Sequence, residues 1–262
     1  MPRIEPRLIP VVADLERGLR QLGVPFGVVG ALVPELLLDV RPARMTNDAD
    51  VTVVVETLGD FETLKGRLSE YGFANTRIPY RLRHASGGVL DILPYSESIA
   101  PNGRLELQGG LVFNMAGFRH VVPHAIEASV EGGPTLPLAP LPLYALLKLV
   151  AFSDRKAAKD LAGVLHCLEH YLESDDRRYG LEYGDGGVPY EYTCAHLLGL
   201  DGRAFLDSAM SRTVSVVLDR FDDPDADVVG LAAAERGRAY VDDEQRAHVF
   251  ELFRWYRLGT GL

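Results

Sequence analysis

The chain has 262 residues, of which 47% are hydrophobic and 24% are charged, a composition typical of globular domains. Its formal net charge of −10 argues against a protein that coats nucleic acid non-specifically, although it leaves room for a local basic surface. The two cysteines form no paired motif, the N-terminus lacks a long apolar run, and no apolar stretch is long enough to cross a bilayer. These features predict a cytoplasmic protein without a membrane span.

Helices and strands alternate in the predicted first half of the chain. Periodicity of the apolar residues indicates helices at 10–22, 31–38 and 61–71, and strands at 24–29, 48–55, 76–84 and 89–93. The last two strands are joined by a short turn containing two glycines, so we expect them to pair as an antiparallel hairpin.

The second half has a different composition. Residues 94–140 are rich in Gly and Pro and predict short strands and loops, whereas a mainly helical region begins near Leu143. Breaks in this region are expected at 180–189 and 222–227. The sequence therefore predicts an α+β protein, with a mixed sheet and flanking helices in 1–140 and a mainly helical domain in 141–262.

Three aspartates on neighbouring strands are the candidate catalytic residues. Asp48 and Asp50 are two residues apart on one strand, so their side chains point to the same face, and Asp91 lies on a later strand. Carboxylates held together repel one another, and a divalent cation removes this conflict. Magnesium prefers such oxygen ligands together with phosphate oxygens. We expect Asp91 either to complete the metal site or to accept a proton from an attacking hydroxyl.

Two further segments have features suited to binding phosphate. Gly30-Ala31, between a strand and a helix, allows phosphate to approach the backbone closely. Lys148, Arg155 and Lys159 share one face if a single helix carries them all, and they would then form a cationic wall. Two alternatives remain open at this point: a helix break near Ser153, and an ordinary solvated charged face.

These motifs resemble those of the nucleotidyltransferase superfamily, most closely the AbiEii-type toxins with their MenT-like relatives. The resemblance covers roughly 10–164. A Gly-Gly or Gly-Ser turn followed by Asp-x-Asp has its counterpart in Gly30-Ala31 and Arg44-Met45-Thr46-Asn47-Asp48-Ala49-Asp50. The run from Lys148 to Arg155 is similar to the second motif, and Arg155 with Lys159-Asp160 to the third. Ala31 departs from the usual glycine or serine, and the last aspartate motif has no clear counterpart in 165–262.

The resemblance implies transfer of a nucleotidyl group from a nucleoside triphosphate to an acceptor hydroxyl, with Mg²⁺ or Mn²⁺ as cofactor. It implies that Asp48, Asp50 and Asp91 are catalytic and hold the metal. The substrate-binding residues would be Gly30, Ala31, Thr46, Lys148, Arg155 and Lys159. The implied acceptor is RNA, such as tRNA, and the implied partner is an antitoxin protein. The alternatives are a small-molecule acceptor, as in antibiotic nucleotidyltransferases, and a nucleotide-binding module of this fold without turnover.

Three other patterns have competing interpretations. His166-Cys167-Leu168-Glu169-His170 matches the H-x-x-E-H pattern of zinc peptidases, but such a short match is more typical of partly buried helix histidines. Arg77, Arg81 and Arg83 alternate along one predicted strand, which suits either a phosphate contact or a charged sheet edge. Aromatic residues near the C-terminus, Phe250, Phe253, Trp255 and Tyr256, predict core packing.

Overall fold

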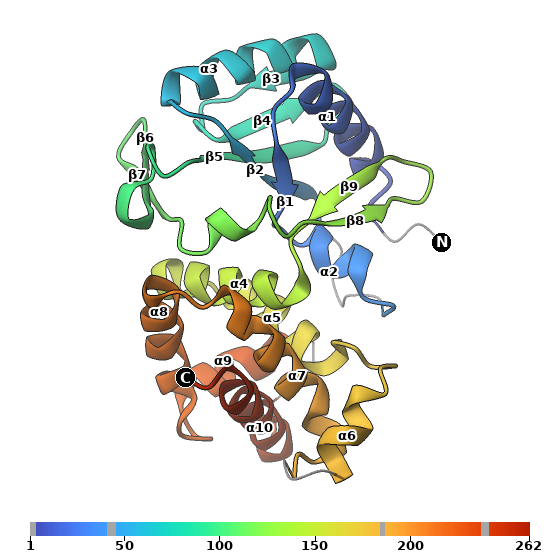
Figure 1. Cartoon of the computed structure of the whole chain (residues 1–262), viewed down its shortest axis with the longest axis vertical. Coiled ribbons are helices and arrows are strands. Elements are labelled where there is room, and N and C mark those ends of the chain that lie inside the picture. The colour runs from blue at the N-terminus through green and yellow to red at the C-terminus, as the bar shows by residue number, and fades with distance from the viewer. Residues whose placement is uncertain (1–3, 41–45, 184–186, 237–240) are drawn as a thin grey trace. The chain divides into compact units, whose positions relative to one another are not determined.

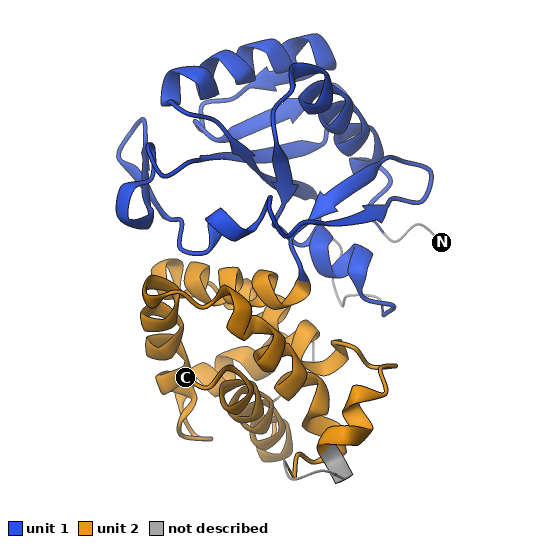
Figure 2. Ribbon diagram, viewed as in Figure 1, with its two compact units in different colours: residues 1–140 blue, residues 141–262 orange. Residues whose placement is uncertain are grey.

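The computed structural model describes residues 4–40, 46–183, 187–236 and 241–262. The chain divides into two compact units, Met1–Pro140 and Leu141–Leu262 (Figure 2). The first contains a mixed β-sheet with flanking helices and the second is mainly helical, so the expected α+β class is confirmed (Figure 1). The functional roles predicted for the two units stay predictions.

A seven-stranded sheet forms the centre of the first unit, in the order β3-β4-β5-β2-β1-β9-β8. The β2–β5 and β1–β9 pairs are parallel, and the other neighbouring strands are antiparallel. The strands are β1 (Phe26–Val28), β2 (Asp48–Val54), β3 (Phe73–Asn75), β4 (Arg81–His84), β5 (Val89–Tyr95), β8 (Ile126–Ser129) and β9 (Thr135–Leu138). Both β2 and β5 are therefore interior strands.

Amphipathic helices cover this sheet. In α1 (Leu8–Leu22) the apolar residues recur at helical spacing and are buried, and the helix packs against β2 and β5. A capping box formed by Thr57 and Asp60 begins α3 (Leu58–Arg67), and a 3₁₀ turn at Leu68–Tyr71 extends it. The short α2 (Leu32–Leu37) follows β1. The termini of α1 and α3 lie close to those predicted from the sequence.

The Gly- and Pro-rich segment forms short strands, as expected. In addition to β8 and β9 it contains the separate hairpin of β6 (Arg104–Leu107) and β7 (Leu111–Asn114). Ala100, Leu105, Leu107 and Met115 are buried in a small cluster with neighbouring aromatic side chains. The hairpin is therefore tied to the first unit by its own apolar contacts.

Seven α-helices among the described residues build the second unit. They are α4 (Leu141–Arg155), α5 (Ala158–His170), α6 (Arg177–Tyr183), α7 (Thr193–Gly202), α8 (Ser208–Leu218), α9 (Asp227–Ala234) and α10 (Asp243–Thr260). A Cβ on Gly199 of α7 would lie 2.3 Å from the Tyr256 carbonyl oxygen, so glycine is required where α7 crosses α10. In the described part of the chain, no helix combines the length and apolar character that a membrane span needs.

The structure decides one alternative that the sequence leaves open and corrects one expectation. The helix that carries Lys148 and Arg155 ends at Arg155, and Lys156 has a φ of 54°, so Lys159 belongs to a different helix, α5. The predicted strand 76–84 is shorter than expected: only β4, Arg81–His84, is a strand within it, and the preceding strand β3 already ends at Asn75. Arg77 therefore lies in a connection, and does not alternate with Arg81 and Arg83 along a strand.

Candidate functional site

The three predicted carboxylates lie on one face of the central sheet. On β2, Ala49 is buried on the opposite face while Asp48 and Asp50 are half-buried. In the parallel pairing of β2 with β5, Asp50 is directly opposite Asp91. Strand periodicity predicts the shared face of Asp48 and Asp50, whereas the position of Asp91 depends on the register between two distant segments.

An arginine from the next strand binds the third carboxylate. Arg81 on β4 is the cross-strand partner of Asp91, and its Nε and Nη2 each donate a hydrogen bond of 2.7 Å to the two oxygens of that carboxylate. The Asp91 side chain is only 13% exposed. Arg81 Nη2 also lies 3.9 Å from Asp48 Oδ2. The hydrogen bonds that Arg81 donates to Asp91 raise the pKa of Arg81, so the guanidinium is held firmly in its charged form.

Gly30 allows the strand-to-helix turn to approach this face. A Cβ at Gly30 would lie 1.8 Å from Asp50 Oδ2, which no side chain can tolerate. The neighbouring Val29 N–H donates to the Asp50 carbonyl at 3.0 Å. The predicted Gly30-Ala31 turn therefore adjoins Asp50. However, α2 has only six residues, so it offers little of a helix dipole to a phosphate.

A buried glutamate that the sequence analysis did not single out supports Asp48. Glu35 on α2 is 2% exposed, and its Oε1 accepts a 2.8 Å hydrogen bond from the Thr46 N–H. Thr46 Oγ1 in turn donates to Asp48 Oδ1 at 2.7 Å. Burial, with a further contribution from Asp48, raises the pKa of Glu35 to about 7, although the hydrogen bond from Thr46 opposes this. The sequence signal for Glu35 is that it is the one charged residue in the apolar run 32–38, which is typical of a buried carboxyl.

Thr46 is one of the predicted substrate-binding residues. In this structure it links Glu35 to Asp48, because its backbone and its hydroxyl make the two hydrogen bonds described above. Arg44 and Met45 of the same motif lie outside the described residues. The role of Thr46 in substrate binding stays a prediction.

The carboxylate face suits a metal only in part. Among the described residues, no group of three or more His, Cys, Asp or Glu side chains is arranged to hold a metal ion. Asp48 and Asp50 provide oxygen donors on a shared face, and the Asp48 side chain is 38% exposed. Both oxygens of Asp91 accept hydrogen bonds from Arg81. The side-chain oxygens of Asp48 and Asp50 are therefore suited to a divalent ion, and in the conformation seen Asp91 forms a bidentate ion pair with Arg81.

Two of the three predicted cations of the helical unit, Lys148 and Arg155, converge on one buried carboxylate. Asp160 on α5 is fully buried and accepts hydrogen bonds of 2.7 and 2.6 Å from Arg155 Nε and Nη2. Lys148 Nζ lies 3.5 Å from Asp160 Oδ1. Lys159 is exposed on α5. Asp160 thus holds Lys148 and Arg155 together across the helix break and neutralises one of their two charges.

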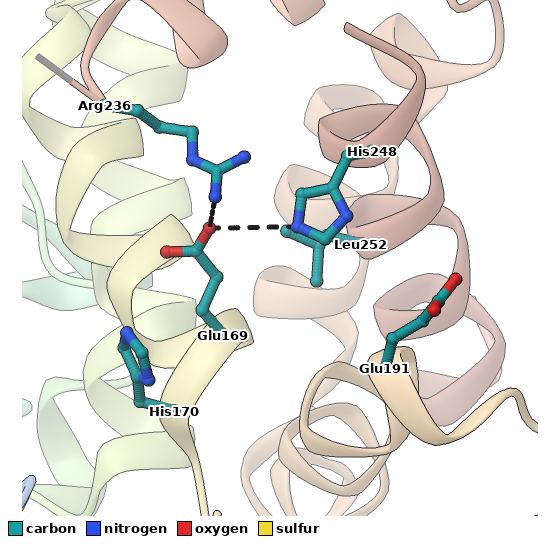
Figure 3. Close-up of a pocket in the computed structure, with 6 residues that line it drawn as sticks. All are labelled: Glu169, His170, Glu191, Arg236, His248 and Leu252. Atoms are coloured by element: carbon teal, nitrogen blue, oxygen red, sulfur yellow. Dashed lines mark ion pairs between the residues drawn. The ribbon is translucent and has the colours of Figure 1, made fainter. Parts of the chain in front are cut away.

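The H-x-x-E-H segment lies beside a pocket of about 270 Å³ in the helical unit. Figure 3 shows Glu169 directed toward Arg236, and the closest charged atoms of this ion pair are 2.7 Å apart. His248 Nε2 is 3.9 Å from the same carboxylate, and burial lowers the pKa of His248. His170 Nδ1 is bonded to Glu173 at 3.2 Å. Glu169 is thus engaged by an arginine, which argues against its use as the base of a zinc peptidase.

No protein-family model matches the sequence, and no curated protein matches it. Among solved structures, the antibiotic-resistance factor ANT(2'')-Ia is 12% identical, covering 81% of this chain and 92% of that chain with a TM-score of 0.39. The cyclic dinucleotide synthase CdnE of Elizabethkingia meningoseptica is 10% identical, covering 100% of this chain and 93% of that chain with a TM-score of 0.28. A CCA-adding enzyme is 13% identical, with 98% and 83% coverage and a TM-score of 0.26. At TM-scores this low, these similarities establish neither the family nor the activity of this chain.

Proposed function

We propose that the protein is a metal-dependent nucleotidyltransferase. The observation that supports this most is the cross-strand register of Asp50 with Asp91, on the face that also carries Asp48. The motifs around these residues are similar to those of AbiEii-type nucleotidyltransferases. Gly30 packs directly against the Asp50 carboxylate, so the absence of a side chain lets the adjoining turn lie close to this face.

In the proposed reaction, an acceptor hydroxyl oxygen bonds to the α-phosphorus while the bond from that phosphorus to pyrophosphate breaks. The hydroxyl proton passes to a base or to solvent. Asp48 and Asp50 would hold a Mg²⁺ or Mn²⁺ ion, which when bound offsets the negative charge of the triphosphate. Thr46, fixed by Glu35, orients Asp48 for this role. Positioning and electrostatic stabilisation provide most of the catalysis in such transfers.

The helical unit is proposed to contribute cations to the triphosphate. Lys148 and Arg155, held together by Asp160, carry one net positive charge between the three side chains. Arg155 can offer a fork of donors to phosphate oxygens, and its side chain is 50% exposed. Exposed Lys159 is a third candidate for this contact, and Ala31 is a candidate for a backbone contact.

We propose RNA as the acceptor on the basis of the motif resemblance, in a toxin that an antitoxin protein would control. The net charge of −10 favours instead an acceptor that is not a polyanion, so a small molecule is the second candidate. The wild type and the Asp48→Asn variant can be incubated with Mg²⁺, total RNA, a small-molecule extract and each nucleoside triphosphate labelled at the α-phosphate. Label transferred by the wild type alone to RNA supports the toxin, and label in the small-molecule fraction supports the second candidate. No transfer to any acceptor contradicts the enzymatic proposal.

A further inference from the structure

A serine, a histidine and an aspartate form a hydrogen-bonded chain in the first unit. His84 is the last residue of β4, and its Nδ1 lies 2.8 Å from Ser86 Oγ in the turn that leads to β5. Its Nε2 lies 3.0 Å from Oδ2 of Asp14 on α1. His84 is 5% exposed, and strand alternation places it on the face of β4 opposite to Arg81, the partner of Asp91. This group of residues is therefore separate from the proposed nucleotidyl-transfer site.

The contacts of His84 indicate which ring nitrogen carries the proton. The Ser86 backbone N–H donates to Nδ1 at 3.2 Å, so Nδ1 has the lone pair and Nε2–H donates to Asp14. The Ser86 hydroxyl, at the shorter distance of 2.8 Å, then also donates to Nδ1. Arg17 binds the other oxygen of Asp14 at 2.6 Å and leaves Oδ2 for the imidazole. A carboxylate that holds an imidazole in the tautomer able to take a serine proton is the arrangement of Ser-His-Asp hydrolases.

The Ser86 hydroxyl is open to solvent. Ser86 is exposed, and a Cβ at the next residue, Gly87, would meet no atom within 4 Å. The Arg7 carbonyl is a second acceptor for the hydroxyl, but at 3.5 Å it is more distant than His84. Fastening the turn to α1 would require the bond between His84 and Asp14, but no hydroxyl on the solvent side of the ring. The position of Ser86 is therefore that of an accessible nucleophile beside a base.

We propose that Ser86 is a nucleophile activated by His84 and Asp14, and that it reacts with small activated acyl esters. Ser86 Oγ bonds to the carbonyl carbon while the bond from that carbon to the leaving-group oxygen breaks. The hydroxyl proton passes to His84 Nδ1 and from there to the leaving-group oxygen. Water then cleaves the acyl-serine in the same way, giving its proton to His84, which returns it to Ser86 Oγ.

Cleavage of p-nitrophenyl acetate by the full chain tests this proposal. Release of p-nitrophenol is followed by absorbance, and mass spectrometry after acid quenching locates the acetyl group. Ser86→Ala should slow release by about tenfold or more, and acetyl should be found on Ser86 in the wild type only. Asp14→Asn should slow release to a similar extent, because an amide allows the other imidazole tautomer. Ser129→Ala is the matched control and should not change the rate, since Ser129 is also exposed but its hydroxyl pairs with Thr135.

Release by Ser86→Ala at the wild-type rate overturns the proposal, and this exposed position lets the variant fold. An Asp14→Asn protein that is folded by circular dichroism and retains the full rate removes the activating role of the carboxylate and also overturns it. Acetyl found on lysine alone in the wild type has the same consequence. None of these measurements involves a nucleotide or a metal, so the result is independent of the proposed nucleotidyl transfer.

Discussion

Asp48 is the residue whose charge the proposed chemistry needs most. Asp48→Asn keeps the shape and the acceptor oxygen for Thr46 Oγ1, but it removes the charge that holds a divalent ion. We expect transfer activity to fall by about 100-fold or more, while the melting temperature stays equal or rises without metal, since a neighbouring like charge is gone. Steady-state transfer and thermal melting measure the two effects.

The control for Asp48 is Glu56→Gln, which neutralises an exposed carboxylate just beyond the other end of β2. It should change neither measurement. Near wild-type activity in Asp48→Asn would remove Asp48 from the site, and a large drop in melting temperature would indicate a structural role instead.

Because Glu35 titrates differently in the folded and unfolded states, we expect the free energy of unfolding to depend on pH. The Glu35→Gln variant should lack this part of the dependence. Burial raises the pKa of Glu35 to about 7 from its ordinary value of 4.5, so the folded state binds this proton more tightly than the unfolded state. The neutral carboxyl therefore makes its full contribution to the free energy of unfolding below about pH 4.5. This contribution is lost as the pH rises toward and past 7. Glu35→Gln stays neutral and can still accept the hydrogen bond from Thr46.

Chemical unfolding at pH 5 and pH 8 measures this effect. Relative to Glu35→Gln, the wild type should lose up to about 3 kcal/mol of unfolding free energy between the two pH values. Ionisation of Asp48 nearby contributes to the raised pKa. A difference between wild type and variant that does not change with pH would contradict the assignment of a protonated Glu35.

At the scale of elements, the α7–α10 crossing depends on glycine. In Gly199→Ala the added Cβ would lie 2.3 Å from the Tyr256 carbonyl oxygen and 2.8 Å from the Thr260 nitrogen, so the two helices must separate. Overpacking of this kind costs about 1–3 kcal/mol. Gly180→Ala in α6 is the matched control, because its Cβ would meet no atom within 4 Å. If both variants melt alike, the close approach does not limit stability.

The proposed contact between the α4–α5 junction and the nucleotide can be tested at Lys148. Lys148→Ala removes one of the two cations that Asp160 holds, and it should weaken binding of nucleoside triphosphate by about tenfold in the presence of Mg²⁺. Isothermal titration measures this, with Arg212→Ala on the exposed side of α8 as a control for the same change in net charge. A weaker affinity for the acceptor alone would assign Lys148 to the other substrate.

At the scale of the whole molecule, we expect the second unit to fold without the first. The largest buried side chains of the second unit include Tyr144, Phe152, Phe253 and Tyr256, all within 141–262. A fragment of these residues should therefore be helical by circular dichroism and melt cooperatively. A fragment without a cooperative transition would show that its core depends on residues 1–140.

Elements whose apolar pattern is local can be predicted from the sequence. The helix periodicity of α1, the strand run of β2 and the two-residue spacing of Asp48 and Asp50 each follow from neighbouring residues. The α+β class follows from their order along the chain. The sequence does not decide whether the helix ends near Arg155, because capping near Ser153 and a continuous helix are both compatible with the same local pattern.

Contacts between charged groups depend on how distant segments of the chain pack together. Asp91 reaches Asp50 and Arg81 through the register of three strands, and shifting that register by one residue would turn the side chains to the opposite face. The burial of Glu35 and its bond to Thr46 depend in the same way on packing across 11 residues of chain. Such contacts join residues far apart in sequence, and their energies depend on desolvation, which no local pattern specifies.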